Sequence, residues 1–403
     1  MNQVVIIGAS HAAAEAIASL RKFGWTGGIV LIGDETSLPY QRPPLSKAYY
    51  KGDVSAEKLL LRPESFYQKN EVELRLGKRA TSINRELKQV SLDDGELIDY
   101  RHLILATGTR ARKLSVDGAE HKSIHYLRSK CDVDNIKAGL KTESKLLIVG
   151  AGYIGLEVAA SAVKQGIKVT VLETMERVLA RVTSPEVSRF YQELHKQEGV
   201  EIRLNTALNT VEQNQNGLTA ICASGEQIEF DSAIIGIGVL PNIELAKEAG
   251  LNCDNGIVVN QYTQTNDEHI YAIGDCSMHH NILYDRDIRL ESVPNAVEQA
   301  KVAASNICEK PLIYNQLPWF WSDQYDVKLQ TAGLFQGYDQ VVIRGDVDNR
   351  KFAAFYLKEG TLIAVDALNS AAEFMLSKKL IQNKASPSAE LLANPEISLK
   401  TLL

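Results

Sequence analysis

Two glycine-rich turns constrain the fold of this chain more than any other feature of its sequence. The first lies in residues 4–13, VVIIGASHAA, and the second in residues 146–155, LLIVGAGYIG. In each, an apolar, β-branched run reaches a glycine and then turns into a segment with helical character. Such a unit directs backbone N–H groups and the positive end of a helix dipole at a pyrophosphate. Two copies in one chain predict two dinucleotides held side by side.

The second turn carries all three glycines of the dinucleotide-binding pattern, Gly150, Gly152 and Gly155. Glu173 follows the strand predicted over residues 168–172. This is about the 20-residue spacing expected of a carboxylate that accepts a hydrogen bond from a ribose 2′-OH. A carboxylate at this place repels a 2′-phosphate, so the sequence favours NADH over NADPH.

The first turn keeps only Gly8 of the three glycines, with Ser10 and Ala13 in the other two places. Small side chains still permit a phosphate to approach the backbone, so we predict a dinucleotide here as well. Its acidic partner is either Asp34 or Glu35, which follow the next apolar strand. The chemistry expected of two such neighbours is electron transfer between them.

Length and charge exclude several classes of protein. A chain of 403 residues suits two or three domains. A net charge of −6 argues against nucleic acid as a partner. The sequence has no apolar run of the roughly 18 residues that a membrane span needs. The strand expected from Val4 leaves no room for a leader sequence, which favours a cytoplasmic location.

The five cysteines occur singly, with no Cys-x-x-Cys pair. This spacing argues against thiol–disulfide exchange by a cysteine pair and against a thiolate metal site, so we expect no metal. Alternating strand and helix patterns predict an α/β fold with two doubly wound parallel sheets, followed by a smaller α+β region.

Further motifs occur between and after the two glycine turns. They are residues 40–47 (YQRPPLSK), 106–108 (ATG), 271–275 (YAIGD), 291–295 (ESVPN) and 318–325 (PWFWSDQY). In this order the motifs resemble the FAD-dependent, NADH-using ferredoxin reductases related to putidaredoxin reductase and rubredoxin reductase. The resemblance covers essentially the whole chain. It implies a discontinuous FAD-binding domain over residues 1–111 and 239–317, an NAD-binding domain over 112–238, and a C-terminal α+β domain over 318–403.

The resemblance implies that FAD lies on the first turn, with Asp275 at the ribityl chain and Val293 and Trp321 at the flavin ring. From the residues alone, Asp275 could equally cap a helix and Trp321 could be ordinary core packing. The implied FAD-binding set is Gly8, Ser10, His11, Ala12, Ala13, Asp34, Glu35, Arg42, Lys47, Ala80, Ala106, Thr107, Gly108, Arg128, Asp275, Ser292, Val293 and Trp321.

NADH is implied on the second turn, by Gly150, Gly152, Tyr153, Ile154, Gly155, Glu157, Glu173 and Gly238. We place Glu157 in the first turn of the helix, where it could simply complement the helix dipole. The resemblance gives it another role beside the nicotinamide, paired with Lys47. Glu291 is a similar candidate, so Lys47, Glu157 and Glu291 form the expected catalytic set. No general acid or base is required, because the cofactors perform the chemistry.

The implied activity is electron transfer from NADH through FAD to a small 2Fe–2S ferredoxin that supplies a haem-thiolate monooxygenase or a ring-hydroxylating oxygenase. Alternatives are a rubredoxin reductase and a flavoprotein resembling apoptosis-inducing factor. An acidic ferredoxin would dock on basic residues, for which we select Arg62, Lys301 and Lys378. Each of these could equally be a solvated surface charge. We expect a monomer or a weak dimer.

Overall fold

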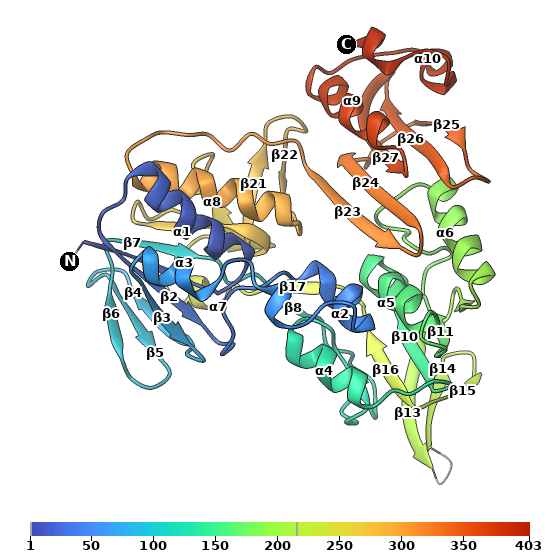
Figure 1. Cartoon of the computed structure of the whole chain (residues 1–403), viewed down its shortest axis with the longest axis horizontal. Coiled ribbons are helices and arrows are strands. Elements are labelled where there is room, and N and C mark those ends of the chain that lie inside the picture. The colour runs from blue at the N-terminus through green and yellow to red at the C-terminus, as the bar shows by residue number, and fades with distance from the viewer. Residues whose placement is uncertain (1, 215–216) are drawn as a thin grey trace. The chain divides into compact units, whose positions relative to one another are not determined.

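The computed structural model describes residues 2–214 and 217–403. The chain forms two compact units (Figure 1). Unit 1 comprises Met1–Gln41, Ala56–Arg110 and Leu240–Trp319, and unit 2 comprises Arg42–Ser55, Ala111–Val239 and Phe320–Leu403. In the described parts of the chain, no helix is long and apolar enough to cross a membrane.

Unit 1 is built on a five-stranded parallel sheet. Its strand order is β20 (Ile270–Ala272), β7 (His102–Leu105), β1 (Gln3–Ile7), β2 (Gly28–Gly33) and β3 (Val72–Leu76). All four pairings in this sheet are parallel. The central strands are apolar on both faces because both faces are covered.

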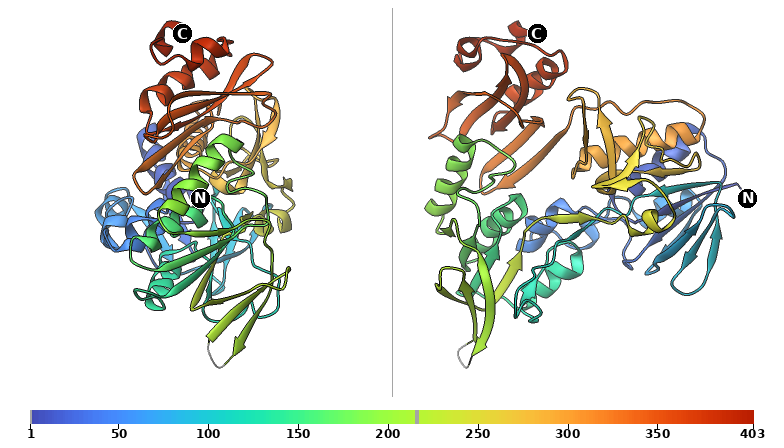
Figure 2. Two further views of the ribbon diagram at one scale, coloured as in Figure 1. Left: turned by 90° about the vertical axis from the view of Figure 1, so that its right-hand side faces the viewer. Right: turned by 180° about the vertical axis from the view of Figure 1, so that it is seen from behind.

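Helices α1 (His11–Phe23) and α8 (Val293–Ile307) lie side by side over one face of this sheet (Figures 1 and 2). The other face is covered by a small antiparallel sheet, β4 (Ala80–Asn84), β5 (Gln89–Leu92) and β6 (Leu97–Asp99). Helix α8 begins directly after Ser292. Its start is fixed because Ser292 caps it and Pro294 fits its first turn.

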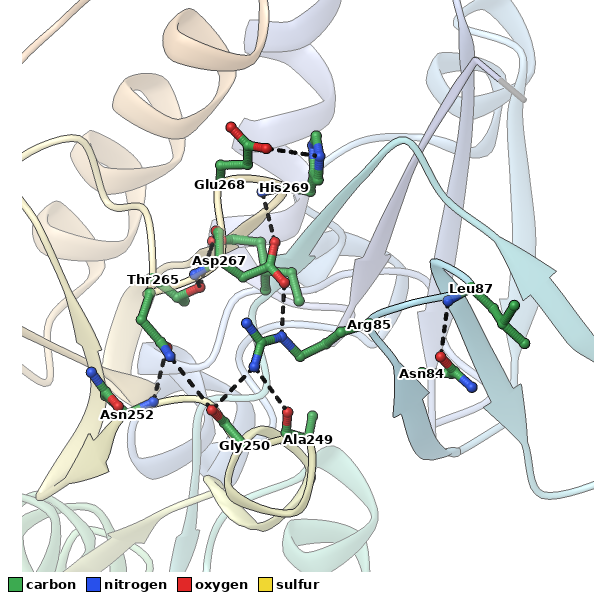
Figure 3. Close-up of polar contacts among 12 residues, drawn as sticks. Asn84, Arg85, Leu87, Ala249, Gly250, Asn252, Thr265, Asp267, Glu268 and His269 are labelled. Atoms are coloured by element: carbon green, nitrogen blue, oxygen red, sulfur yellow. Dashed lines mark hydrogen bonds and ion pairs between the residues drawn. The ribbon is translucent and has the colours of Figure 1, made fainter.

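An ion pair at the end of β4 joins distant segments of unit 1 (Figure 3). The Arg85 Nε donates to Asp267 Oδ2 at 2.7 Å, and its Nη1 donates to the Gly250 carbonyl at 3.2 Å. Burial alone raises the pKa of Asp267, but the Arg85 hydrogen bond and the His269 backbone N–H lower it overall. The charged pair fixes the segment that enters β20. Unit 1 also contains α3 (Glu64–Lys69), α7 (Glu244–Glu248) and a sheet of β18 (Cys253–Asp254), β19 (Gly256–Val259), β21 (Ser277–Asn281) and β22 (Arg286–Ile288).

Unit 2 repeats the same parallel arrangement. Its strand order is β12 (Glu201–Arg203), β11 (Lys168–Leu172), β10 (Lys145–Val149), β16 (Ser232–Ile235) and β9 (Ile124–His125). Helices α4 (Lys130–Ala138), α5 (Tyr153–Val163) and α6 (Pro185–Gln197) belong to this part, with the antiparallel sheet of β13 (Leu208–Asn214), β14 (Gly217–Cys222) and β15 (Gln227–Phe230). Strands β10 and β1 hold equivalent central positions, as expected from the two similar glycine turns.

The C-terminal part of unit 2 is an α+β fold, as predicted. Its sheet has the order β23 (Trp319–Gln324), β24 (Val327–Gly333), β27 (Thr361–Leu368), β26 (Lys351–Lys358) and β25 (Gln340–Asp346), followed by α9 (Ala371–Gln382) and α10 (Ala389–Ala393). Asp366 on β27 is fully buried and accepts from the hydroxyls of Thr183, Thr331 and Tyr356. Burial raises the pKa of Asp366.

Candidate functional site

The first glycine turn lies where β1 ends in unit 1. Gly8 has φ +108°, and a Cβ there would lie 2.1 Å from the carbonyl oxygen of Ala106. Only glycine fits so close to that backbone. Ser10, in extended conformation, precedes α1, and Ala13 in the third glycine place is fully buried. The substituted turn therefore keeps the tight strand-to-helix geometry that a pyrophosphate site requires.

Both candidate acids lie after β2, at the same edge of the sheet. Asp34 is exposed and forms an ion pair with Arg79, at 3.1 Å. Glu35 accepts a 2.6 Å hydrogen bond from the Tyr40 hydroxyl. Ala80, one of the predicted contacts, is the first residue of β4 and directly follows Arg79. The sequence reasoning missed Arg79, whose charge places a cation beside the expected ribose acid.

The turn after β7 is held by an amide that the motifs did not reveal. The Asn242 side chain donates to the Thr107 carbonyl at 2.8 Å, and the Thr107 hydroxyl donates to the Asn242 carbonyl at 2.7 Å. This reciprocal pair fixes the conformation of residues 106–108. Burial raises the pKa of the neighbouring Cys276 thiol, which suits packing rather than thiolate chemistry.

Asp275 lies in a single turn of 3₁₀ helix, Gly274–Cys276. Gln299, fully buried on α8, accepts from the backbone N–H of Gly274 at 2.7 Å and from the Ser277 hydroxyl at 2.8 Å. A Cβ on Gly274 would lie 3.5 Å from that of Ala12, so this turn packs against the start of α1. Sequence reasoning also missed Gln299, which lies between Glu298 and Ala300 with no local signal of its role.

The start of α8 carries the remaining candidates of unit 1. Ser292 caps the helix, its hydroxyl accepting from the Asn295 N–H at 3.3 Å, and Val293 is the first helical residue. Glu291 is exposed and forms a 2.7 Å ion pair with Arg289. Arg289 also donates to the Asp275 carbonyl at 3.2 Å, so these motifs meet at one place.

In the second glycine turn, which lies in unit 2, each of the three glycines has a different structural role. Gly150 has φ +106°, and a Cβ there would lie 2.4 Å from the Gly236 carbonyl oxygen. A Cβ on Gly155 would lie 2.2 Å from the Gly150 carbonyl oxygen. At Gly152, by contrast, a Cβ would meet no heavy atom within 4 Å among the described residues. Gly152 borders open space at the helix N-terminus, which is the geometry that admits an anion.

Glu173 lies at the end of β11, beside this turn. Its Oε2 accepts from the Ala151 N–H at 2.8 Å and its Oε1 accepts from the Met175 N–H at 2.9 Å. Arg177, the nearest basic residue along the chain, donates instead to the carbonyls of Ala180 and Thr183. Its guanidinium is therefore engaged within its own loop.

The other residues assigned to the nicotinamide dinucleotide surround this turn. Tyr153 and Ile154 form the first turn of α5, and the ring of Tyr153 packs edge-on against Phe320 at 4.9 Å. Gly238 has φ +100°, and a Cβ there would meet no described heavy atom within 4 Å. Its carbonyl accepts from the Arg112 N–H at 3.0 Å.

The structure pairs Lys47 with Glu157, as predicted, at 2.8 Å between Nζ and Oε1. The placement of Glu157 in the first helical turn is wrong, because α5 begins at Tyr153 and Glu157 is its fifth residue. Glu157 is 3% exposed, too deep in the helix to act as a dipole-complementing surface acid. It is a buried charge held by a partner.

Two serines complete the partners of this carboxylate. The Ser46 hydroxyl donates to Glu157 Oε2 at 2.5 Å, and the Ser322 hydroxyl donates to Oε1 at 2.6 Å. Pro43 and Pro44 open the short 3₁₀ helix Pro43–Ser46, which delivers Ser46 and Lys47 together. Sequence reasoning missed both serines. The signal for Ser322 was strand alternation, which turns it to the face opposite Trp321.

Of the other predicted residues in unit 2, Arg42 and Arg128 are brought together. The guanidinium of Arg42 donates to the Arg128 carbonyl at 3.0 Å. Trp321, in the middle of β23, is partly exposed.

Each selected docking residue has an intramolecular contact. Lys301 forms a 2.7 Å ion pair with Glu298. Arg62 lies 3.9 Å from Glu15, and Lys378 lies over the ring of Phe374.

These features define a class of protein, one in which a single chain carries two units of the dinucleotide-binding type. Each unit has a parallel sheet whose central strand ends in a glycine turn, followed by a helix and a carboxylate at the next strand end. The residues fit two dinucleotides, because glycine is required at Gly8 and Gly150 and open space lies beside Gly152.

Comparison with known proteins gives the family. Residues 2–300 match the pyridine nucleotide-disulphide oxidoreductase family, and residues 319–403 match the reductase C-terminal family. The chain therefore belongs to the pyridine nucleotide-disulphide oxidoreductase family. All five of its cysteines are free thiols in the structure.

Two relatives and one solved structure match the chain over nearly its whole length. Putidaredoxin reductase of Pseudomonas putida is 44% identical, covering 100% of this chain and 97% of that protein. Rhodocoxin reductase of Rhodococcus erythropolis is 42% identical, covering 98% and 93%. The crystal structure of a covalent putidaredoxin reductase–putidaredoxin complex matches with a TM-score of 0.96 at 43% identity, covering 99% of this chain and 97% of that chain. The predicted family and fold class are confirmed.

Proposed function

We propose that this protein is a flavoprotein reductase that passes electrons from NADH through FAD to a small 2Fe–2S ferredoxin. The ferredoxin in turn supplies a haem-thiolate monooxygenase or a ring-hydroxylating oxygenase. The observation that carries the proposal is the duplicated nucleotide-binding architecture in a chain 44% identical to a putidaredoxin reductase over its full length. The matching crystal structure, in which a putidaredoxin reductase is joined covalently to putidaredoxin, supports a ferredoxin as the partner.

FAD is assigned to the first glycine turn and the residues named with it above, and NADH to the second glycine turn. When bound, the two cofactors supply hydride transfer and the division of an electron pair into single electrons. The chain itself positions them. The rigid turns at Gly8 and Gly150 set the approach of the pyrophosphates, Gln299 holds the turn that carries Asp275, and the pair of Lys47 with Glu157 fixes a cation for the flavin.

A preference for NADH over NADPH belongs to this proposal. Glu173 is already oriented by two backbone N–H groups, and a 2′-phosphate near it would meet a fixed negative charge. The nearest cation along the chain, Arg177, is engaged with backbone carbonyls. The proposal also includes an FAD-binding domain over residues 1–111 and 239–317, an NAD-binding domain over 112–238 and a C-terminal domain over 318–403. It places ferredoxin docking at Arg62, Lys301 and Lys378. It further includes a cytoplasmic location and a monomeric or weakly dimeric state.

The test uses the purified full chain. It is expected to be yellow, to release FAD on denaturation, and to bleach rapidly with NADH in the absence of air. Candidate 2Fe–2S ferredoxins and a rubredoxin are then titrated against it, with cytochrome c as the final acceptor. Protein that neither contains nor takes up FAD would refute the proposal. Faster turnover with rubredoxin would make it a rubredoxin reductase, and rapid flavin reduction with no carrier reduced would favour the role resembling apoptosis-inducing factor.

A further inference from the structure

The carboxylate of Glu157 lies at one end of a chain of hydrogen bonds that runs along β23 to helix α6. Ser322 donates to Glu157 at 2.6 Å, and the Gln324 side-chain amide donates to the Ser322 oxygen at 3.3 Å. The other end of Gln324 faces His195 Nε2 at 2.8 Å, and His195 Nδ1 faces the Tyr325 hydroxyl at 3.0 Å. Ser322, Gln324 and His195 are all buried.

The direction of every bond in this chain follows from its members. Burial lowers the pKa of His195 to about 4, so the ring is neutral at neutral pH and has one donor and one acceptor. Because Gln324 presents its carbonyl oxygen to Nε2, that nitrogen carries the proton and Nδ1 accepts from Tyr325. Ser322 gives its only proton to Glu157 and accepts from the Gln324 amide.

All four dipoles therefore point their positive ends toward the carboxylate of Glu157. Hydrogen bonds aligned in this way polarise one another, and a buried carboxylate gains most from such donors. The carboxylate is also the partner of Lys47, so whatever holds Glu157 also holds the ammonium group.

We propose that Ser322, Gln324, His195 and Tyr325 are positioning residues that hold the Glu157 carboxylate in its orientation, and through it fix the Lys47 ammonium group. This inference rests on the proposed function, in which Lys47 lies at the flavin. It makes the rate of flavin reduction by NADH depend on the Tyr325 hydroxyl, which contacts His195.

The experiment compares three single variants of the holoenzyme. Ser322→Ala removes the donor that contacts Glu157, and Tyr325→Phe removes only the most distant donor while keeping the ring. Tyr191→Phe is the matched control, because Tyr191 is on α6 near His195 and its buried hydroxyl has no hydrogen-bond partner among the described residues.

Two quantities are measured without air, the rate of flavin bleaching at saturating NADH and the equilibrium constant for flavin reduction from titration with NADH and NAD⁺. We expect Ser322→Ala to lower both by about three- to tenfold, less than the full loss of a donor to a charged group, because Glu157 keeps Ser46 and Lys47 as partners. Tyr325→Phe lowers them less, because its hydroxyl is the donor farthest from Glu157. Tyr191→Phe behaves as the unmodified protein.

Repeating the measurements in a Lys47→Met variant distinguishes a positioning role from general damage to the fold. In Lys47→Met, which removes the ammonium group, adding Ser322→Ala or Tyr325→Phe should change neither quantity further. Effects of equal size in both backgrounds, or no effect of either variant in the unmodified background, would overturn the inference. If the unmodified protein binds no FAD or is not reduced by NADH, the proposed function itself fails.

Discussion

Replacing Gly152 by alanine separates nucleotide binding from folding at the second glycine turn. Gly152 has φ −80° and ψ 178°, a conformation open to alanine, and the new Cβ would meet no described heavy atom within 4 Å. The cost to folding is limited to the weaker N-cap, below about 1 kcal/mol. Gly155→Ala is different, because its Cβ would lie 2.2 Å from a backbone oxygen. Overpacking of this kind costs about 1–3 kcal/mol.

The effect on NADH follows from the space that the methyl group takes. A pyrophosphate held by the N–H groups of this turn would be pushed back and would lose one hydrogen bond to a charged group, about 1.5–3 kcal/mol. At about 1.4 kcal/mol for each factor of ten, the NADH dissociation constant should rise about ten- to a hundredfold. FAD content should not change, because the assigned FAD turn is at Gly8.

The assay is anaerobic flavin reduction at increasing NADH, together with urea unfolding of each variant. Gly139→Ala is the control, since Gly139 has φ −90°, lies in the same unit at the end of α4, and its Cβ would make only an ordinary 3.7 Å contact. Gly152→Ala with normal stability and normal NADH affinity would refute the assignment of the pyrophosphate to this turn.

Three further changes test other parts of the structure. Glu173→Gln should weaken the preference for NADH over NADPH, measured as the ratio of the two flavin-reduction efficiencies, because a fixed negative charge is removed. A ratio at or below one in the unmodified protein would contradict the ribose assignment. Lys301→Glu should slow ferredoxin reduction, most strongly at low salt, while NADH-driven bleaching is unchanged; an equal loss in both half-reactions would mean damage to the fold. Burial lowers the pKa of His195 from 6.5 to about 4, so between these pH values the unfolded chain binds more protons than the folded chain. The free energy of unfolding should therefore fall by up to about 3 kcal/mol as the pH drops through this range. Urea unfolding at several pH values checks this, and an unchanged pH dependence in His195→Gln would count against it.

The sequence determined the two glycine turns because their conformational requirements are local. Gly8 and Gly150 follow apolar strands directly, and both need a positive φ that glycine adopts without strain. The same kind of local signal predicted the α/β class and the acid after the second strand of each parallel sheet. The pairing of Lys47 with Glu157 came from the family resemblance, since nothing in either local segment indicates the other.

Only the tertiary structure decided how the buried polar groups are satisfied. Ser46 and Ser322 lie 111 and 165 positions from Glu157 in the sequence, and no periodicity relates them. Gln299 likewise accepts from the Gly274 N–H only because α8 packs against the turn that contains Gly274. A buried charge or N–H must find a partner, but which residue supplies it depends on how the sheet and helices bring distant segments together. Neighbouring residues determine the local conformation of the chain, whereas tertiary packing determines which residues become hydrogen-bond partners.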